Sequence, residues 1–212
     1  MKRFAFFAVV FFSSYAFTNA QNEKKPEFFA GYSYESVNSG ITSSDLQSTG
    51  LGQTSLDNRF NLNGLNLSGA AYFTKHLGIV GDFSAHFNNR TDLFDSVSAR
   101  SKFRLYNVTA GPQYRFSAAG RFTPFTHALF GVARRNLTEE FSDGTNAFTD
   151  SGTSFALNLG GGVDYRLNDK FAVRIFQLDY NPIFLRSRTI SSVTFPDTTL
   201  QGVRISAGIV IR

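Results

Sequence analysis

The sequence predicts an all-β fold, an eight-stranded antiparallel barrel of the up-and-down type, on three observations. Phe supplies 25 and Gly 18 of the 212 residues, while Asp, Glu, Lys and Arg together make up only 17% of the chain. This composition favours strands and turns over helices. Apolar residues recur with a period of two in eight separate segments. The linkers between these segments are short and long in strict alternation.

The first twenty residues have the pattern of a cleaved secretory signal peptide. Lys2 and Arg3 form a positive start, residues 4–12 are an unbroken apolar run, and Thr18-Asn19-Ala20 supplies short residues before the cleavage site. The run is too short to cross a bilayer as a helix, which takes roughly 20 residues. We therefore expect residues 1–20 to be removed and residues 21–212 to form one barrel domain.

Alternation is clearest in residues 153–167. Every odd position from Phe155 to Leu167 is apolar or Gly, whereas Asn158, Asp164 and Arg166 occupy even positions. Successive side chains of a strand point to opposite faces, so this segment is predicted to have one apolar and one polar face. Seven more segments follow the rule: 27–35, 62–73, 77–87, 102–116, 122–134, 171–180 and 200–211.

Two of these segments deviate from a simple alternation. In residues 122–134 both faces carry apolar residues, so the phase is open. In residues 171–180 the inner positions Arg174 and Gln177 differ in parity. One extra residue shifts the phase of a strand, so we expect a β-bulge at Ile175-Phe176.

Segment length and linker length both indicate a membrane. A tilted strand needs roughly 9–11 residues to cross a bilayer, whereas strands of soluble proteins centre near 5–6. Outer-membrane barrels join their strands by short periplasmic turns and longer extracellular loops. The short linkers here are residues 74–76, 117–121 and 168–170, and the long polar ones are 36–61, 88–101, 135–152 and 181–199.

The polar face of the strands distinguishes a membrane barrel from a soluble, lipocalin-like barrel. A soluble barrel would turn this face to water and carry many Lys and Glu there. Instead it holds few charges, of both signs, among small residues, which suits a narrow and filled lumen. We expect six side chains to close the lumen by ion pairs: Asp82, Asp164, Arg166, Arg174, Asp179 and Arg204. Three further polar side chains are expected inside: His86, His127 and Gln177.

Five segments resemble the OmpA/OmpX-type eight-stranded outer-membrane β-barrels. They are GPQ at 111–113, TPFTHA at 123–128, LGGGVD at 159–164, VRIFQLDY at 173–180 and RISAGIV at 204–210. The resemblance covers essentially the whole predicted mature chain and implies a barrel with both termini in the periplasm. It implies no activity, because a fold does not fix a function. Such barrels usually end on an aromatic residue that the insertion machinery reads, whereas this sequence ends Val210-Ile211-Arg212.

No catalytic residue, metal site or cofactor is predicted. Ser84 and His86 share a face, as the pair of a hydrolase would, but that face is expected to point into the lumen and no acid is placed to orient the pair. His127 has no second His or carboxylate at a ligand spacing on its strand. The glycines at 160–162 lie within a strand that no helix follows, unlike a nucleotide-binding loop.

We therefore expect a monomeric outer-membrane protein with a structural or loop-mediated interaction or adhesion role and no catalysis. A lipid-modifying barrel enzyme of the lipid A deacylase type and a narrow, low-conductance channel are the alternatives. Expected partners are outer-membrane lipid and lipopolysaccharide, the barrel-insertion machinery, and an extracellular ligand bound through the long loops. The charges, net +5, are scattered, so nucleic-acid binding is not expected.

Overall fold

The computed structural model describes residues 26–38, 59–94, 97–141, 146–185, 188–190, 193–195 and 197–212. The predicted signal peptide, residues 1–20, lies outside this part. The strands of the described residues are β1 (Glu27–Asn38), β2 (Arg59–Tyr72), β3 (Leu77–Phe94), β4 (Val97–Arg115), β5 (Phe122–Phe141), β6 (Asn146–Arg166), β7 (Phe171–Leu185), β8 (Arg188–Ile190), β9 (Val193–Phe195) and β10 (Thr198–Ile211). Within these ranges no helix is long and apolar enough to cross a membrane.

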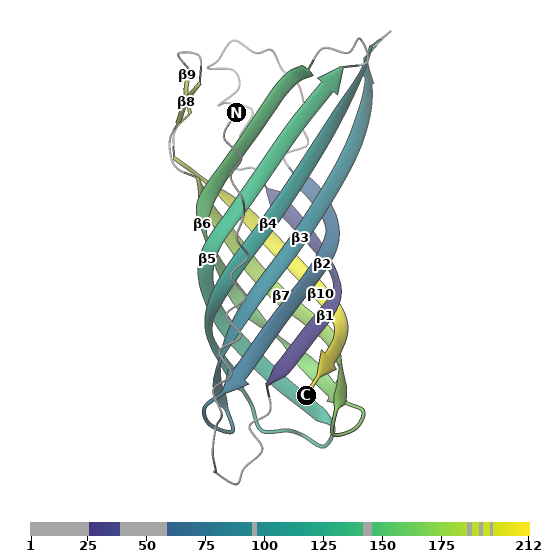
Figure 1. The fold of residues 1–212 in the computed structure, drawn as a ribbon, viewed down its shortest axis with the longest axis vertical. Helices are drawn as coiled ribbons and strands as arrows, with labels where there is room; N and C mark the ends of the chain where they lie inside the picture. The colour runs from purple at the N-terminus through teal and green to yellow at the C-terminus, as the bar shows by residue number, and fades with distance from the viewer. Residues whose placement is uncertain are drawn as a thin grey trace, which may run out of the picture.

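Eight of the strands close into one antiparallel barrel (Figure 1). Each long strand pairs with the next long strand along the chain, and β1 closes the ring by pairing with β10, where Phe28 lies opposite Ile211. The short strands β8 and β9 pair only with each other. In the closed ring each of the eight strands is therefore paired on both sides. The predicted eight-stranded up-and-down barrel is confirmed.

The two ends of the barrel differ in their connections. One end, here called the turn end, holds the short connections 73–76, 116–121 and 167–170 together with Arg212. Thr74 Oγ1 accepts hydrogen bonds from the backbone N–H groups of His76 and Leu77, a local device that tightens the first turn. Gly120 has a φ of 65°, a conformation that favours glycine. The opposite end is called the loop end.

The eight predicted segments are all strands, and their bounds at the turn end agree to within one residue. At the loop end the strands are longer than predicted. Strands β3 and β4 pair as far as Phe94 and Val97, and β5 and β6 as far as Glu140 and Asn146. The prediction of loops over 88–101 and 135–152 was therefore wrong for most of these residues. Alternation of apolar and polar residues ends where lipid ends, whereas backbone pairing continues because it satisfies N–H and C=O groups in water as well.

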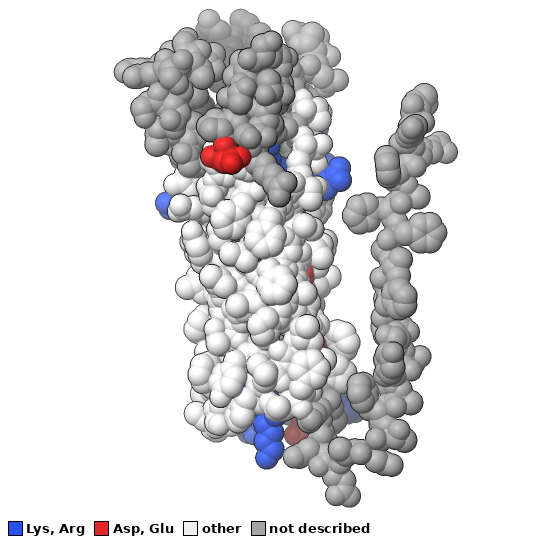
Figure 2. Space-filling model, turned by 90° about the vertical axis from the view of Figure 1, so that its left-hand side faces the viewer, with Lys and Arg blue, Asp and Glu red and all other residues white. Residues whose placement is uncertain are grey.

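The outer surface of the barrel is apolar between its two ends. Figure 2 shows charged side chains gathered near the ends and an almost uncharged wall between them. On β6, Phe155 and Leu159 are about half exposed, whereas Asn158 and Asp164 are buried. This confirms the predicted phase of that strand. On β5 the exposed residues include Phe130, which settles the phase that the sequence left open.

Strand β7 contains the predicted β-bulge. Phe176 lies opposite Val163 and Arg174 opposite Asp164, so β7 has one more residue than β6 between the two pairs. The register of β7 with β10 shifts at the same place. As a result Ile175 and Phe176 are both exposed, and both Arg174 and Gln177 point into the lumen.

Candidate functional site

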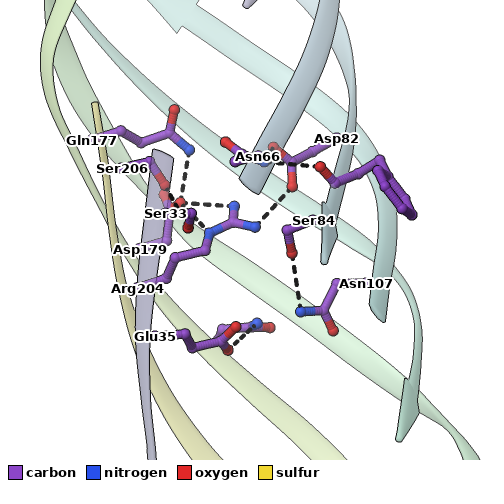
Figure 3. Close-up of polar contacts among 12 residues, drawn as sticks. Ser33, Glu35, Asn66, Asp82, Ser84, Asn107, Gln177, Asp179, Arg204 and Ser206 are labelled. Carbon is purple, nitrogen blue, oxygen red and sulfur yellow. Dashed lines mark hydrogen bonds and ion pairs between the residues drawn. The ribbon is translucent and has the colours of Figure 1, made fainter. Parts of the chain in front are cut away.

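The lumen is centred on Arg204 of β10, which is fully buried (Figure 3). Its Nε and Nη2 donate to Oδ2 of Asp179 at 3.0 and 2.8 Å. Its Nη1 donates to Oδ1 of Asp82 at 3.0 Å. Asp179 lies directly opposite Arg204 on the neighbouring strand β7, while Asp82 belongs to β3 on another part of the wall. One guanidinium therefore ties two walls of the barrel together.

Neutral and imidazole side chains complete the shell around these two acids. Asn66 Nδ2 donates to Asp82 Oδ2 at 2.7 Å, and Gln177 Nε2 donates to Asp179 Oδ2 at 2.7 Å. His127 Nε2 lies 2.9 Å from Asp179 Oδ1. Buried carboxylates need this many hydrogen-bond and ion-pair partners, because burying a charge without a partner costs on the order of several kcal/mol.

A second ion pair joins β6 to β7 at the bulge. Arg174 Nε donates to Asp164 Oδ1 at 2.8 Å, and Nη1 donates to Gln177 Oε1 at 2.6 Å. Gln177 thereby links this pair to Asp179. The Arg174 guanidinium also lies over the rings of Phe29 and Phe125, 4.4 and 4.2 Å from their centroids, which adds cation–π attraction. The bulge is what lets Arg174 and Gln177 both take part.

Arg166 corrects one of the sequence predictions. It has the parity of Asp164 and was expected in the lumen, but its side chain is exposed. Arg166 is the last residue of β6 and borders the turn at 167–170, where the lumen ends and the side chain can reach water. Arg212 approaches Asp164 in its place, with Nη2 3.9 Å from Oδ2.

Glu35 is a buried acid that the sequence analysis missed. Asn181 Nδ2 donates to its Oε1 at 2.8 Å, and His86 Nδ1 lies 2.9 Å from its Oε2. The same His86 ring lies 2.9 Å from Ser33 Oγ through Nε2. The signal was available, because Glu35 has the opposite parity to the outward-facing Tyr32 and Tyr34 in residues 27–35.

The turn end of the lumen is closed by a further cluster. Glu27 forms ion pairs with Arg115 and with Arg212, whose Nε lies 2.5 Å from Glu27 Oε1. The Arg115 guanidinium lies 3.9 Å from the centroid of the Tyr72 ring, and Gln113 donates to the Tyr72 hydroxyl. These contacts were not predicted, because Glu27, Arg115 and Arg212 lie at the ends of their strands, where parity does not determine whether a side chain enters the lumen.

An apolar layer fills the lumen on the loop-end side of the polar residues, and sequence reasoning did not anticipate it. On β1 it follows Glu35 with Val37, and on β4 it precedes Asn107 with Leu105. Such side chains have the inward parity of their strands but look like ordinary lipid-facing residues. The buried members are Val37, Leu62, Phe103, Leu105, Ala133, Ala156, Ile183 and Leu200.

The geometry of Ser84 and His86 does not resemble a hydrolase site. Both side chains are fully buried. Ser84 Oγ accepts a hydrogen bond from Asn107 Nδ2 at 3.2 Å, and His86 contacts Ser33 and Glu35 instead. Neither group is exposed on the lipid-facing wall, where a lipid substrate would lie. Among the described residues there is also no group of three His, Cys, Asp or Glu placed to hold a metal.

Membrane-facing aromatic walls around a filled lumen define a small outer-membrane β-barrel. The model of the outer membrane protein beta-barrel domain family matches residues 4–208, and the chain belongs to that family. The protein is therefore located in the outer membrane. A search of curated proteins found no relative.

Two solved structures illustrate the shared fold. Neisserial surface protein A is 13% identical, with a TM-score of 0.55 over 88% of this chain and 96% of that one. Ail, the attachment invasion locus protein of Yersinia pestis, is 18% identical in its complex with the heparin analogue sucrose octasulfate. It has a TM-score of 0.52 over 87% of this chain and 97% of that one.

Proposed function

We propose that this protein is a structural outer-membrane barrel without catalysis, whose loop end faces outward and serves as an interaction or adhesion surface. The observation that carries the proposal is the filled lumen. Side chains occupy it at the turn end around Glu27, in the middle around Arg204 and toward the loop end around Leu105. The surfaces left for a partner are the loop end and the lipid-facing wall.

At the loop end, four strands are longer than is needed to cross a membrane. Strands β3 to β6 have 18, 19, 20 and 21 residues, against the roughly 9–11 that a tilted strand needs. Their paired hairpins therefore extend beyond the lipid. Rigid paired strands present a surface at a lower entropic cost of binding than unstructured loops do.

Basic side chains near the loop end suggest a first ligand class to test. Arg59 on β2 and Arg100 on β4 are exposed beyond the apolar wall. Guanidinium groups bind sulfate and phosphate oxygens well. Ail was crystallised with a polysulfated heparin analogue. A sulfated polysaccharide is accordingly the ligand that we would offer first.

The experiment compares bacteria displaying the wild-type protein with bacteria displaying a trimmed variant, on heparin-coated surfaces. In the variant an Asn-Gly turn replaces residues 90–101 and joins Asn89 to Lys102, which are partners in the register of β3 and β4. We expect the wild type to increase attachment several-fold and the trimmed variant to lose most of that gain. A control, Lys75→Gln with Lys170→Gln, changes charge at the turn end and should attach like the wild type. Attachment of the wild type at the level of empty-vector cells would contradict the proposal.

A further inference from the structure

Two arginines lie side by side on the outer surface where the apolar wall ends. Arg104 of β4 lies opposite Asn136 of β5, and Arg134 of β5 lies opposite Tyr106 of β4. The two arginines are thus diagonal neighbours on one face, a relation that brings side chains within about 7–8 Å. Both are exposed. Lys102, with the same parity, follows Arg104 toward the loop end.

Each arginine is the first charged residue above the lipid-facing run of its strand. Toward the turn end, Arg104 is followed on its face by Tyr106 and the exposed Val108, and Arg134 by the exposed Val132. Within the described ranges, no acidic partner pairs with either guanidinium. Long basic side chains at this depth extend into the headgroup layer, where anionic lipid groups are the available counter-ions.

A hollow lies on the same wall, closer to its middle. A single register line runs from Phe28 through Gly69, Gly81 and Ala110 to Phe130, crossing β1 to β5. The exposed side chains of the two phenylalanines form the walls of the hollow, and the three small residues between them form its floor. A Cβ atom added at Gly81 would meet no atom within 4 Å. The hollow measures about 900 Å³ and is lined almost wholly by apolar surface.

The arginines and the hollow are separated by the depth of one lipid leaflet. Arg104 and Ala110 are on the same face of β4, six residues apart, which is about 20 Å along a strand. With the usual tilt of roughly 35–45° this is about 15 Å along the membrane normal, half of the ~30 Å hydrocarbon core. An acyl chain whose headgroup sits at Arg104 would therefore reach the hollow.

We infer that this face binds one phosphate-bearing lipid of the outer leaflet, of the lipid A type. Arg104 and Arg134 hold its phosphate groups, and the hollow at Gly69, Gly81 and Ala110 receives an acyl chain. A bisphosphorylated headgroup matches two adjacent guanidinium groups better than a zwitterionic phospholipid does, because each guanidinium can hold one phosphate through paired hydrogen bonds. The choice of outer leaflet rests on the proposed outward orientation of the loop end.

The test uses the full-length protein folded in detergent, titrated with lipid A and examined by native mass spectrometry. The wild type is expected to retain one lipid A. Arg104→Gln with Arg134→Gln should weaken retention at least about tenfold, as expected for the loss of charge-assisted hydrogen bonds worth more than 1.4 kcal/mol. The matched control, Arg121→Gln with Arg166→Gln, removes the same charge from exposed positions at the turn end and should retain lipid A like the wild type.

A second variant tests the hollow alone. Gly81→Leu with Ala110→Leu fills the floor without touching the arginines, and the open space at Gly81 means that the barrel should still fold, as judged by its faster migration in unheated gels. It should reduce retention of lipid A severalfold.

Three results would overturn the site: equal retention by the Arg104/Arg134 variant, equal loss in the turn-end control, or displacement of lipid A by equimolar inorganic phosphate. A lipid-free dimer that disappears when the hollow is filled would instead assign this face to a second copy and would also overturn it. Heparin attachment by displayed cells is independent of all four results, so a failure here is distinct from a failure of the adhesion role.

Discussion

Arg204 on β10 and Asp82 on β3 meet across the lumen, 3.0 Å apart, although 122 positions separate them in the chain. Asp179 holds the same guanidinium from the strand beside it. One side chain therefore joins the neighbouring strands β10 and β7 to β3 on another part of the barrel wall. The contribution of this contact to the stability of the barrel can be measured.

Replacing Arg204 by Ala should destabilise the barrel by about 3–5 kcal/mol, because Asp82 and Asp179 would be left as uncompensated buried charges. Reversible urea unfolding in lipid vesicles measures this loss. Arg166→Ala removes an arginine of the same chain that is exposed, and should change stability by less than about 0.5 kcal/mol. Equal effects of the two substitutions would show that the lumenal pairs contribute nothing.

The wild-type barrel should show no steady large conductance in planar bilayers. Three layers of side chains block the lumen in series, so opening one layer is not enough. Leu105→Ala thins only the apolar layer and should also remain closed, although core truncation of this kind costs roughly 2–5 kcal/mol. A general porin in the same bilayers provides the positive control. Stable single-channel steps from the folded wild type would be incompatible with a filled lumen.

Gly160 should tolerate no side chain. A Cβ atom there would lie 2.1 Å from Asp179 Oδ1 and 2.3 Å from the backbone oxygen of Leu178. Gly160→Ala must therefore displace either the central acid or strand β7, and we expect it to cost about 1–3 kcal/mol. Gly81→Ala is the matched control, since its Cβ meets open space, and it should be neutral or stabilising by up to about 1 kcal/mol. Unfolding curves that rank the two variants in the reverse order would refute the close packing of Asp179 and β7 against Gly160.

Deleting Ile175 should leave the barrel folded and convert the bulge of β7 into regular pairing. Ile175 is the extra residue between the pairs Val163–Phe176 and Asp164–Arg174, so without it Arg174 and Gln177 are two positions apart and both still face the lumen. Deleting Val163 from β6, which has no extra residue there, should instead prevent correct folding. The residues on one side of that deletion change face, so either Asn158 or Asp164 would point to lipid. Heat-modifiability on gels reports the folded fraction of both, and an Ile175 deletion that unfolds as completely as the Val163 deletion would contradict this account.

The sequence contains most of the barrel but only part of the lumen. Alternation located all eight membrane strands, and the parity break between Arg174 and Gln177 located the bulge, because lipid on one side and a filled lumen on the other impose a strict period of two. The ends of the hairpins escaped, because no lipid constrains their pattern.

Partner choice inside the lumen escaped for a different reason. Parity says that Arg204, Asp82 and Asp179 face inward, but which of them meet depends on the stagger and tilt of the strands, which no local pattern records. Leu105 could not be recognised as a lumenal residue from its type, since an inward leucine and a lipid-facing leucine have the same chemistry. Arg166 shows that parity assigns a face and not a depth.

The seam between β1 and β10 has a consequence for how the protein is made. Ser33 and Ser206, joined by a hydrogen bond across this seam, are 173 positions apart. A ribosome therefore delivers the first strand long before the strand that completes the ring, and throughout that interval β1 has a bare edge. Such an edge can pair with any other exposed strand, including one of a neighbouring nascent chain. Self-association of the incomplete sheet therefore competes with closure of the barrel until the final strand pairs with β1.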